Sequence, residues 1–143
     1  MDTVKKILWI DDDINRFSLM PYIDELKEKG ITVVKAENPD ESKEILSKEY
    51  DFQCIIVDIS MPPGDSIPFG ESKGGTQTGL LILKQLVEDT SLGNVKKVVF
   101  TIVDNAEVRE YCNNQTPKIP YLEKHNFFTD KFVEEIKQII NGD

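Results

Sequence analysis

The chain has 143 residues, of which 39% are hydrophobic and 30% are charged, with 26 acidic against 17 basic side chains and a formal net charge of −9. This negative charge argues against nucleic acid or an anionic membrane as a partner. The longest apolar runs, such as Leu80–Leu83, are too short to span a bilayer, and residues 1–6 lack a secretory apolar segment. Two cysteines, Cys54 in a strand-like run and Cys112 in a helix-like one, predict reduced thiols in a cytoplasmic protein, and neither has metal-ligand spacing.

Strand-like and helix-like segments alternate five times along the chain. The apolar, β-branched runs that predict strands are Ile7–Ile10, Ile31–Lys35, Cys54–Val57, Val98–Ile102 and Ile119–Leu122. These runs are apolar almost throughout, which is typical of strands covered on both faces. Five β–α units with right-handed crossovers predict an α/β fold, namely a flavodoxin-like, doubly wound, five-stranded parallel sheet of order 2-1-3-4-5, (βα)5.

The helical segments between these strands have their own signals. Pro21 predicts that the first helix is kinked or starts late. In the second, Asn38 is the expected N-cap, Pro39 takes the first helical position and Glu41 completes a capping box. The last helix places five apolar residues on one stripe: Phe132, Val133, Ile136, Ile139 and Ile140.

Residues 63–78, PGDSIPFGESKGGTQT, do not fit this alternation. Connections in β–α units usually take about two to six residues, so this stretch is an insertion after the third strand. It could gate a site at that strand's end or present Ile67 and Phe69 to a partner. A neutral extension is an equal alternative, because lengthening a loop costs little stability. We see no linker, and therefore expect a single domain over residues 1–143.

Polar residues stand where the predicted strands end, namely Asp11, Asp12, Asp13, Asp58, Thr101 and Lys124. Ligands of open α/β sheets bind outside the carboxyl ends of the strands, so these side chains should meet at one rim. Clustered carboxylates repel one another unless a cation neutralises them, and Mg²⁺ prefers oxygen ligands. A carboxylate can act as a nucleophile on phosphorus when a metal and a lysine offset the charge of the transferring group.

At these residues the sequence resembles the receiver domain of two-component response regulators, over essentially its whole length. The resemblance rests on the acid pair Asp11–Asp12, D-x-x-M-P at Asp58–Pro62, G-L-x-x-L-K at Gly79–Lys84, Thr101, and Y-x-x-K at Tyr121–Lys124. No single motif is specific. Their occurrence together, in order and each at its strand end, supports the resemblance.

The resemblance implies a phosphoacceptor and a metal site. Asp58 would accept a phosphoryl group from the phosphohistidine of a sensor histidine kinase or a phosphotransfer protein. Asp12 would bind Mg²⁺ directly and Asp11 largely through water, with Asp58 and the backbone carbonyl of Ser60 as further ligands. Asp13 is better explained as a helix cap than as a ligand.

The resemblance also implies a conformational switch. Lys124 would pair with Asp58 and then with the phosphoryl oxygens. Thr101 would hydrogen-bond the phosphoryl group, and Tyr121 would rotate inward behind it, changing the face of the fourth helix, fifth strand and fifth helix. Taken singly, Thr101 and Tyr121 are ordinary strand residues and Lys124 is an ordinary surface lysine. The chain would then signal to a protein partner and would not be an enzyme, and we expect it to stand alone without an output domain.

Two residues depart from the family's pattern. Ile102 follows the threonine where the family usually has a small residue, so we expect slower phosphoryl exchange at Asp58. His125 follows the lysine where proline is common, so we expect a trans peptide bond or a reshaped loop. A polar loop residue explains His125 better than a phosphorelay or ligand role does.

Parts of the sequence also resemble features of three other functions. The glycine-rich Gly74–Gly79 resembles the phosphate loop of flavodoxins only faintly, because it follows the wrong strand. Asp11 and Asp13 have the spacing of a haloacid-dehalogenase-like phosphatase, but the chain is short for that fold. The serious alternative is a receiver-like protein-interaction module that acts without phosphorylation.

Overall fold

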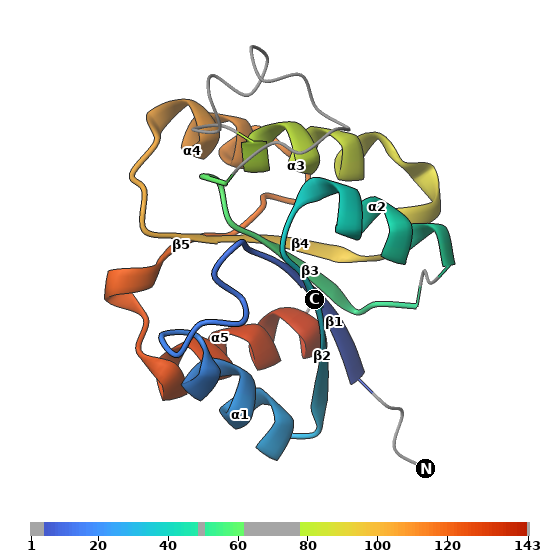
Figure 1. Ribbon diagram of the computed structural model, residues 1–143. Helices are drawn as coiled ribbons and strands as arrows, with labels where there is room; N and C mark the ends of the chain where they lie inside the picture. The colour runs from blue at the N-terminus through green and yellow to red at the C-terminus, as the bar shows by residue number, and fades with distance from the viewer. Residues whose placement is uncertain (1–4, 49–50, 62–77, 143) are drawn as a thin grey trace.

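The computed structural model describes residues 5–48, 51–61 and 78–142. It contains a five-stranded parallel sheet of order β2-β1-β3-β4-β5, which confirms the predicted flavodoxin-like, doubly wound topology (Figure 1). The strands are β1 (Lys5–Ile10), β2 (Ile31–Ala36), β3 (Cys54–Val57), β4 (Lys96–Thr101) and β5 (Tyr121–Glu123).

The ends of the last two strands differ from the prediction. β4 ends at Thr101, whose partner in the ladder is Glu123, and the next residue, Ile102, is 70% exposed. β5 begins at Tyr121 because the N–H of Ile119 donates to Cys112 O, 3.1 Å away, and so does not join the sheet. Apolar character predicts strand for both residues, whereas the exposure of Ile102 and the hydrogen bond of the Ile119 N–H exclude them from the sheet.

Among the described residues, five α-helices and two short 3₁₀ turns connect the strands or follow the last of them. They are α1 (Met20–Glu28), α2 (Pro39–Lys48), α3 (Thr78–Glu88), η1 (Thr90–Leu92), α4 (Ala106–Asn113), η2 (Lys124–Asn126) and α5 (Thr129–Asn141). α1 and α5 lie on one face of the sheet, and α2, α3 and α4 lie on the other (Figure 1). No helix among the described residues is long and apolar enough to cross a membrane.

The helix starts confirm two predictions and correct a third. α1 starts late, with Pro21 in its first turn, and the N–H of Glu41 donates to Asn38 Oδ1 over 2.8 Å at the start of α2. Asp13, however, does not cap a helix. The N-cap of α1 is Leu19, because residues 12–19 form turns, and Asp13 instead pairs with Arg16 at 2.8 Å.

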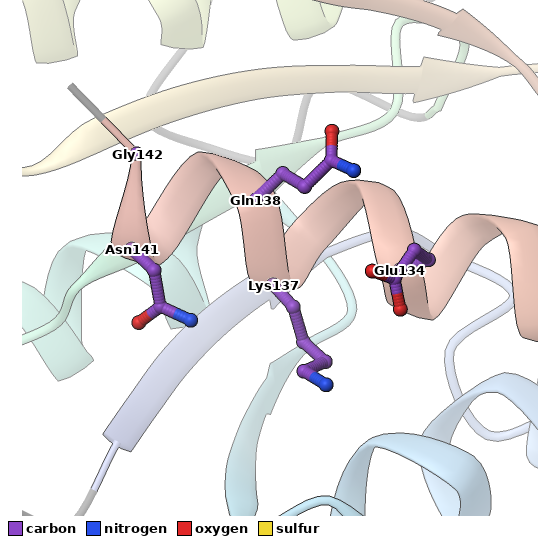
Figure 2. Close-up of a pocket in the computed structure, with 5 residues that line it drawn as sticks. All are labelled: Glu134, Lys137, Gln138, Asn141 and Gly142. Atoms are coloured by element: carbon purple, nitrogen blue, oxygen red, sulfur yellow. The ribbon is translucent and has the colours of Figure 1, made fainter.

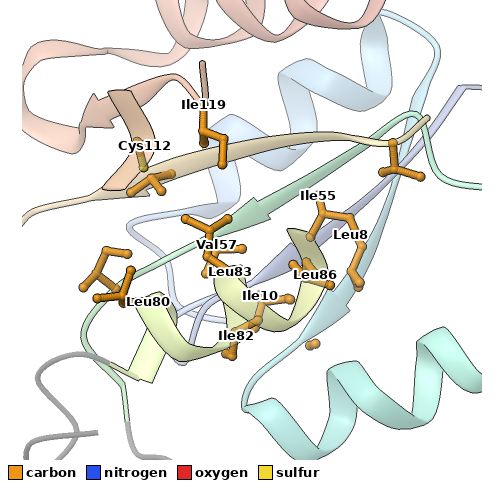
Figure 3. Packing of buried hydrophobic residues seen from close by; sticks show 14 of the residues in the cluster. Leu8, Ile10, Ile55, Val57, Leu80, Ile82, Leu83, Leu86, Cys112 and Ile119 are labelled. Atoms are coloured by element: carbon orange, nitrogen blue, oxygen red, sulfur yellow. The ribbon is translucent and has the colours of Figure 1, made fainter. Parts of the chain in front are cut away.

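Buried apolar side chains fill both faces of the sheet. Alternate residues of β1 point to opposite faces: Leu8 joins the cluster under α2, α3 and α4, whereas Trp9 joins the cluster under α1 and α5. Figure 3 shows the first cluster, where α3 packs on the middle strands through Leu80, Ile82, Leu83 and Leu86. In the second cluster the rings of Phe100 and Phe132 stack at 4.2 Å between centroids. Double-sided burial explains why the strands are apolar throughout.

The strand register determines which polar residues become neighbours. Ile10 of β1 lies opposite Val57 of β3, so the residues that follow them, Asp11 and Asp58, stand side by side. The N–H of Asp58 donates to Ile10 O over 2.9 Å and fixes this alignment. The parallel strands therefore bring the predicted carboxylates to one rim of the sheet.

The predicted insertion, residues 63–78, lies outside the described residues except for Thr78, which is the first residue of α3.

Candidate functional site

The rim of the sheet holds two buried carboxylates that share one ammonium group. Asp11 is fully buried and Asp58 is 5% exposed. Lys124 Nζ lies 2.7 Å from Asp11 Oδ2 and 3.7 Å from Asp58 Oδ2. The resemblance predicted that Lys124 would pair with Asp58. The structure places it between both acids and closer to Asp11.

The remaining carboxylate oxygens are held by the backbone. Asp11 Oδ1 accepts from the N–H of Asp13, and Asp58 Oδ1 accepts from the N–H of Ile59, each over 2.8 Å. These bonds orient both side chains at the end of their strands. Each acid therefore has one oxygen fixed by an amide and the other turned toward Lys124.

The electrostatics of the rim follow from burial and crowding. Burial and the neighbouring charge of Asp11 raise the pKa of Asp58 from 3.8 to about 6, against the opposing effects of Lys124 and of hydrogen bonding by Thr101. Although burial disfavours the ammonium, Asp58 and Asp11 together raise the pKa of Lys124 above 10.5. One lysine thus does not neutralise two acids, and the site keeps an excess of negative charge.

The carboxylates offer oxygen ligands to a cation. Oxygens of Asp11, Asp12 and Asp13 lie within 4.8 Å of one another. Burial and the two neighbouring acids raise the pKa of Asp12, whose side chain faces solvent. Ser60, also exposed, stands two residues after Asp58. Hard oxygen donors of this kind, with excess negative charge beside them, fit Mg²⁺.

Gly79 is a motif residue whose physical role the sequence did not reveal. A Cβ at this position would lie 2.1 Å from the carbonyl oxygen of Asp58 and 2.5 Å from Cα of Ile59. The N–H of Gly79 also donates to Ile59 O over 2.8 Å. Only glycine lets the first turn of α3 approach the backbone of Asp58 this closely. The G-L-x-x-L-K motif pointed to this residue without its reason.

The two predicted switch residues lie on neighbouring strands. Thr101 is fully buried, its hydroxyl accepts from the N–H of Val103 over 3.3 Å, and its influence lowers the pKa of Asp58. Tyr121 is half-buried. Its hydroxyl donates to Val103 O and accepts from the N–H of Asn105 over 3.1 Å. Both residues therefore contact Val103, in the connection between β4 and α4.

The structure also describes the two residues that depart from the family's pattern, His125 and Ile102. The Lys124–His125 peptide bond is trans, as expected. The His125 side chain is 62% exposed, and its Nε2 lies 2.9 Å from Glu123 Oε2. The exposed Ile102 side chain follows Thr101 at the rim.

A surface hollow among the described residues lies away from the acidic rim. It is formed at the C-terminal end of α5 by Glu134, Lys137, Gln138, Asn141 and Gly142, drawn in Figure 2. None of these residues belongs to the rim formed by Asp11, Asp58 and Lys124, so this hollow is a separate feature.

Comparison with solved structures identifies the fold. The chain is similar to a response regulator from Thermotoga maritima (18% identity, 98% of this chain and 100% of that chain, TM-score 0.68). It is also similar to a CheY-like receiver domain protein from Methanospirillum hungatei (21% identity, 97% and 95%, TM-score 0.71) and to the BeF3-activated receiver domain of DrrB (17% identity, 96% and 98%, TM-score 0.67). The chain has the fold of a response-regulator receiver domain.

No family model matches the sequence, and no curated protein matches it. At the identities found, the likeness to receiver domains is one of fold. The chemistry of this receiver fold must therefore be argued from the residues at its own rim.

Proposed function

We propose that this chain is a response regulator that accepts a phosphoryl group on Asp58 in an Mg²⁺-dependent reaction. The observation that supports this best is the buried pair of Asp58 and Asp11 around the single ammonium of Lys124. A structural ion pair needs only one carboxylate for each lysine. A second buried carboxylate is costly unless a further cation or a transferred group completes the site.

The chain's residues would divide the transfer between them. An Asp58 oxygen forms the new P–O bond while the P–N bond of the donor's phosphohistidine breaks, and the imidazole leaves with the electron pair and takes a proton from solvent. Lys124 offsets charge on the phosphoryl oxygens, and the Thr101 hydroxyl donates a hydrogen bond to one of them. With a pKa of about 6, Asp58 is largely ionised at neutral pH and can act as the nucleophile.

The metal would be held by Asp12, by Asp11 largely through water, by Asp58, and by the backbone carbonyl of Ser60. When bound, Mg²⁺ supplies positive charge that the two-acid, one-lysine site lacks.

The donor would be a sensor histidine kinase or a phosphotransfer protein, and the output would be a conformational change read by a protein partner. We place that change at Thr101 and Tyr121, because both contact the connection between β4 and α4. In this proposal the chain is one cytoplasmic receiver domain with an insertion at 63–78, and it is a signalling module, not an enzyme.

The test is intact mass after incubation with Mg²⁺ and acetyl phosphate. We expect the mass of one phosphoryl group to be added, and to be absent with EDTA or in Asp58→Asn. Asp51→Asn is the matched control, because this exposed aspartate precedes the same strand at the opposite edge of the sheet. Phosphorylation retained in Asp58→Asn would disprove the assignment of the acceptor.

The alternative function is a protein-interaction module that acts without phosphate. Large apolar side chains exposed at this rim favour it: Phe17 is 88%, Phe128 is 73% and Ile102 is 70% exposed. This alternative predicts no mass gain and no binding of beryllofluoride, a tetrahedral phosphoryl analogue, by the folded protein.

A further inference from the structure

We propose that Arg109 is a positioning residue that holds Tyr121 against the connection between β4 and α4, and through it keeps Thr101 directed at Asp58. The inference rests on the proposed function, because Thr101 acts there on the phosphoryl group. Arg109 lies in α4, and its Cζ is 4.2 Å from the centroid of the Tyr121 ring. A guanidinium at this distance is attracted to the ring face.

Two carboxylates fix the guanidinium over that ring. Arg109 Nε lies 2.7 Å from Asp104 Oδ1, in the connection between β4 and α4. Arg109 Nη2 pairs with Glu123 Oε1, at the end of β5. The planar group therefore joins three segments, and its rigid fork specifies one orientation relative to the tyrosine.

Tyr121 is held at its other end by the same connection. Its hydroxyl donates to Val103 O and accepts from the N–H of Asn105. Asn105 is also the N-cap of α4, where its Oδ1 accepts from the N–H of Val108 over 3.2 Å. The tyrosine thus spans from β5 to the start of α4, with Arg109 against its ring.

A short chain of contacts links this arrangement to the acid site. The N–H of Val103 donates to Thr101 Oγ1. Thr101 ends β4, which pairs in parallel with β3, and Asp58 directly follows β3, so the two residues stand at the same rim. Release of Tyr121 would free Val103 and allow Thr101 to leave Asp58. Arg109 therefore favours the arrangement in which Thr101 faces the site.

A merely stabilising ion pair would behave differently. The Arg109 side chain is 38% exposed, and pairs of this exposure contribute little to stability. We therefore expect Arg109→Ala to unfold close to the wild-type temperature. Its effect should appear in the environment of Tyr121 and in binding at Asp58.

The experiment uses the full chain labelled with 3-fluorotyrosine, with the Tyr121 ¹⁹F resonance assigned by Tyr121→Phe. Without ligand, Arg109→Ala should move this resonance toward that of solvent-exposed tyrosine. Arg109→Lys, which keeps the charge but loses the fork, should move it part of the way. Lys84→Ala is the matched control, since Lys84 lies 5.6 Å from the ring of the neighbouring Tyr111; it should leave the Tyr121 resonance unchanged.

Binding of beryllofluoride with Mg²⁺ is then measured by the fluorescence of Trp9, the only tryptophan. Arg109→Ala should bind about fivefold more weakly than wild type, the lower end of typical coupling between sites. An unchanged Tyr121 resonance, or a moved resonance with unchanged affinity, would overturn the inference. If wild type binds no beryllofluoride, the proposed function and the coupling both fail, whereas the ligand-free spectra still decide whether Arg109 positions Tyr121.

Discussion

Replacement of Gly79 by alanine tests whether close packing of α3 places the phosphoacceptor. The new Cβ would lie 2.1 Å from Asp58 O, 2.5 Å from Ile59 Cα and 2.8 Å from Asp58 C, all of them backbone atoms. Real Cβ contacts are essentially never below 3.0 Å, so the backbones must separate by roughly 0.9 Å. Backbone atoms cannot rotate away as a flexible side chain can.

The separation should affect both stability and the site. Overpacking in a close-packed interior costs about 1–3 kcal/mol, so the free energy of unfolding should fall by that amount in a urea titration. Asp58 should also be displaced relative to Asp11 and Lys124. We therefore expect this displacement to weaken Mg²⁺ binding on the order of tenfold. A tenfold change corresponds to a loss of about 1.4 kcal/mol in binding free energy.

Two other glycines provide controls. Gly93→Ala places its Cβ 3.4 Å from Thr90 O, an ordinary contact, and should be near neutral. Gly30 has φ of 81° and open space around it, so Gly30→Ala should lose about 1–2 kcal/mol through backbone strain alone. Mg²⁺ binding, followed by Trp9 fluorescence, should be unchanged in both. Normal Mg²⁺ affinity in a folded Gly79→Ala protein, or an equal loss in Gly30→Ala, would refute this account of how α3 positions Asp58.

Three further predictions follow from burial and exposure. Because burial and Asp11 raise the pKa of Asp58 from 3.8 to about 6, the folded state holds this proton more tightly than the unfolded chain, and stability falls as pH rises between these values. Asp58→Asn should therefore unfold at a higher temperature than wild type above pH 6 without metal, with the advantage shrinking toward pH 4; no advantage at pH 7.5 would contradict the shift. Burial raises the pKa of Cys54 to about 12 and that of Cys112 to about 11, so neither thiol should react with Ellman's reagent at pH 8 until urea unfolds the chain. Ile102→Ala should increase the rates of phosphorylation and hydrolysis at Asp58 if Ile102 restricts access, and unchanged rates in a time course of intact mass would show that it does not.

The sequence alone predicted the sheet and the composition of its rim. Continuous apolar runs predict strands buried on both faces. Their alternation with helical segments predicts a parallel sheet with right-handed crossover connections. Once that topology is inferred, every residue after a strand, including Asp11, Asp58 and Lys124, must lie at one edge. The topology and the position of these residues follow from the local hydrophobic pattern and from the order of the elements along the chain, and both can be read from the sequence.

Only the tertiary structure decided how those residues meet. Lys124 lies closer to Asp11, 113 positions away along the chain, than to its expected partner Asp58. The need for Gly79, and the contact of Arg109 with Tyr121, likewise depend on how helices pack on the sheet. Such contacts join residues that are distant in sequence, and packing shifts of a fraction of an ångström decide them. No local pattern of residues specifies distances of that size.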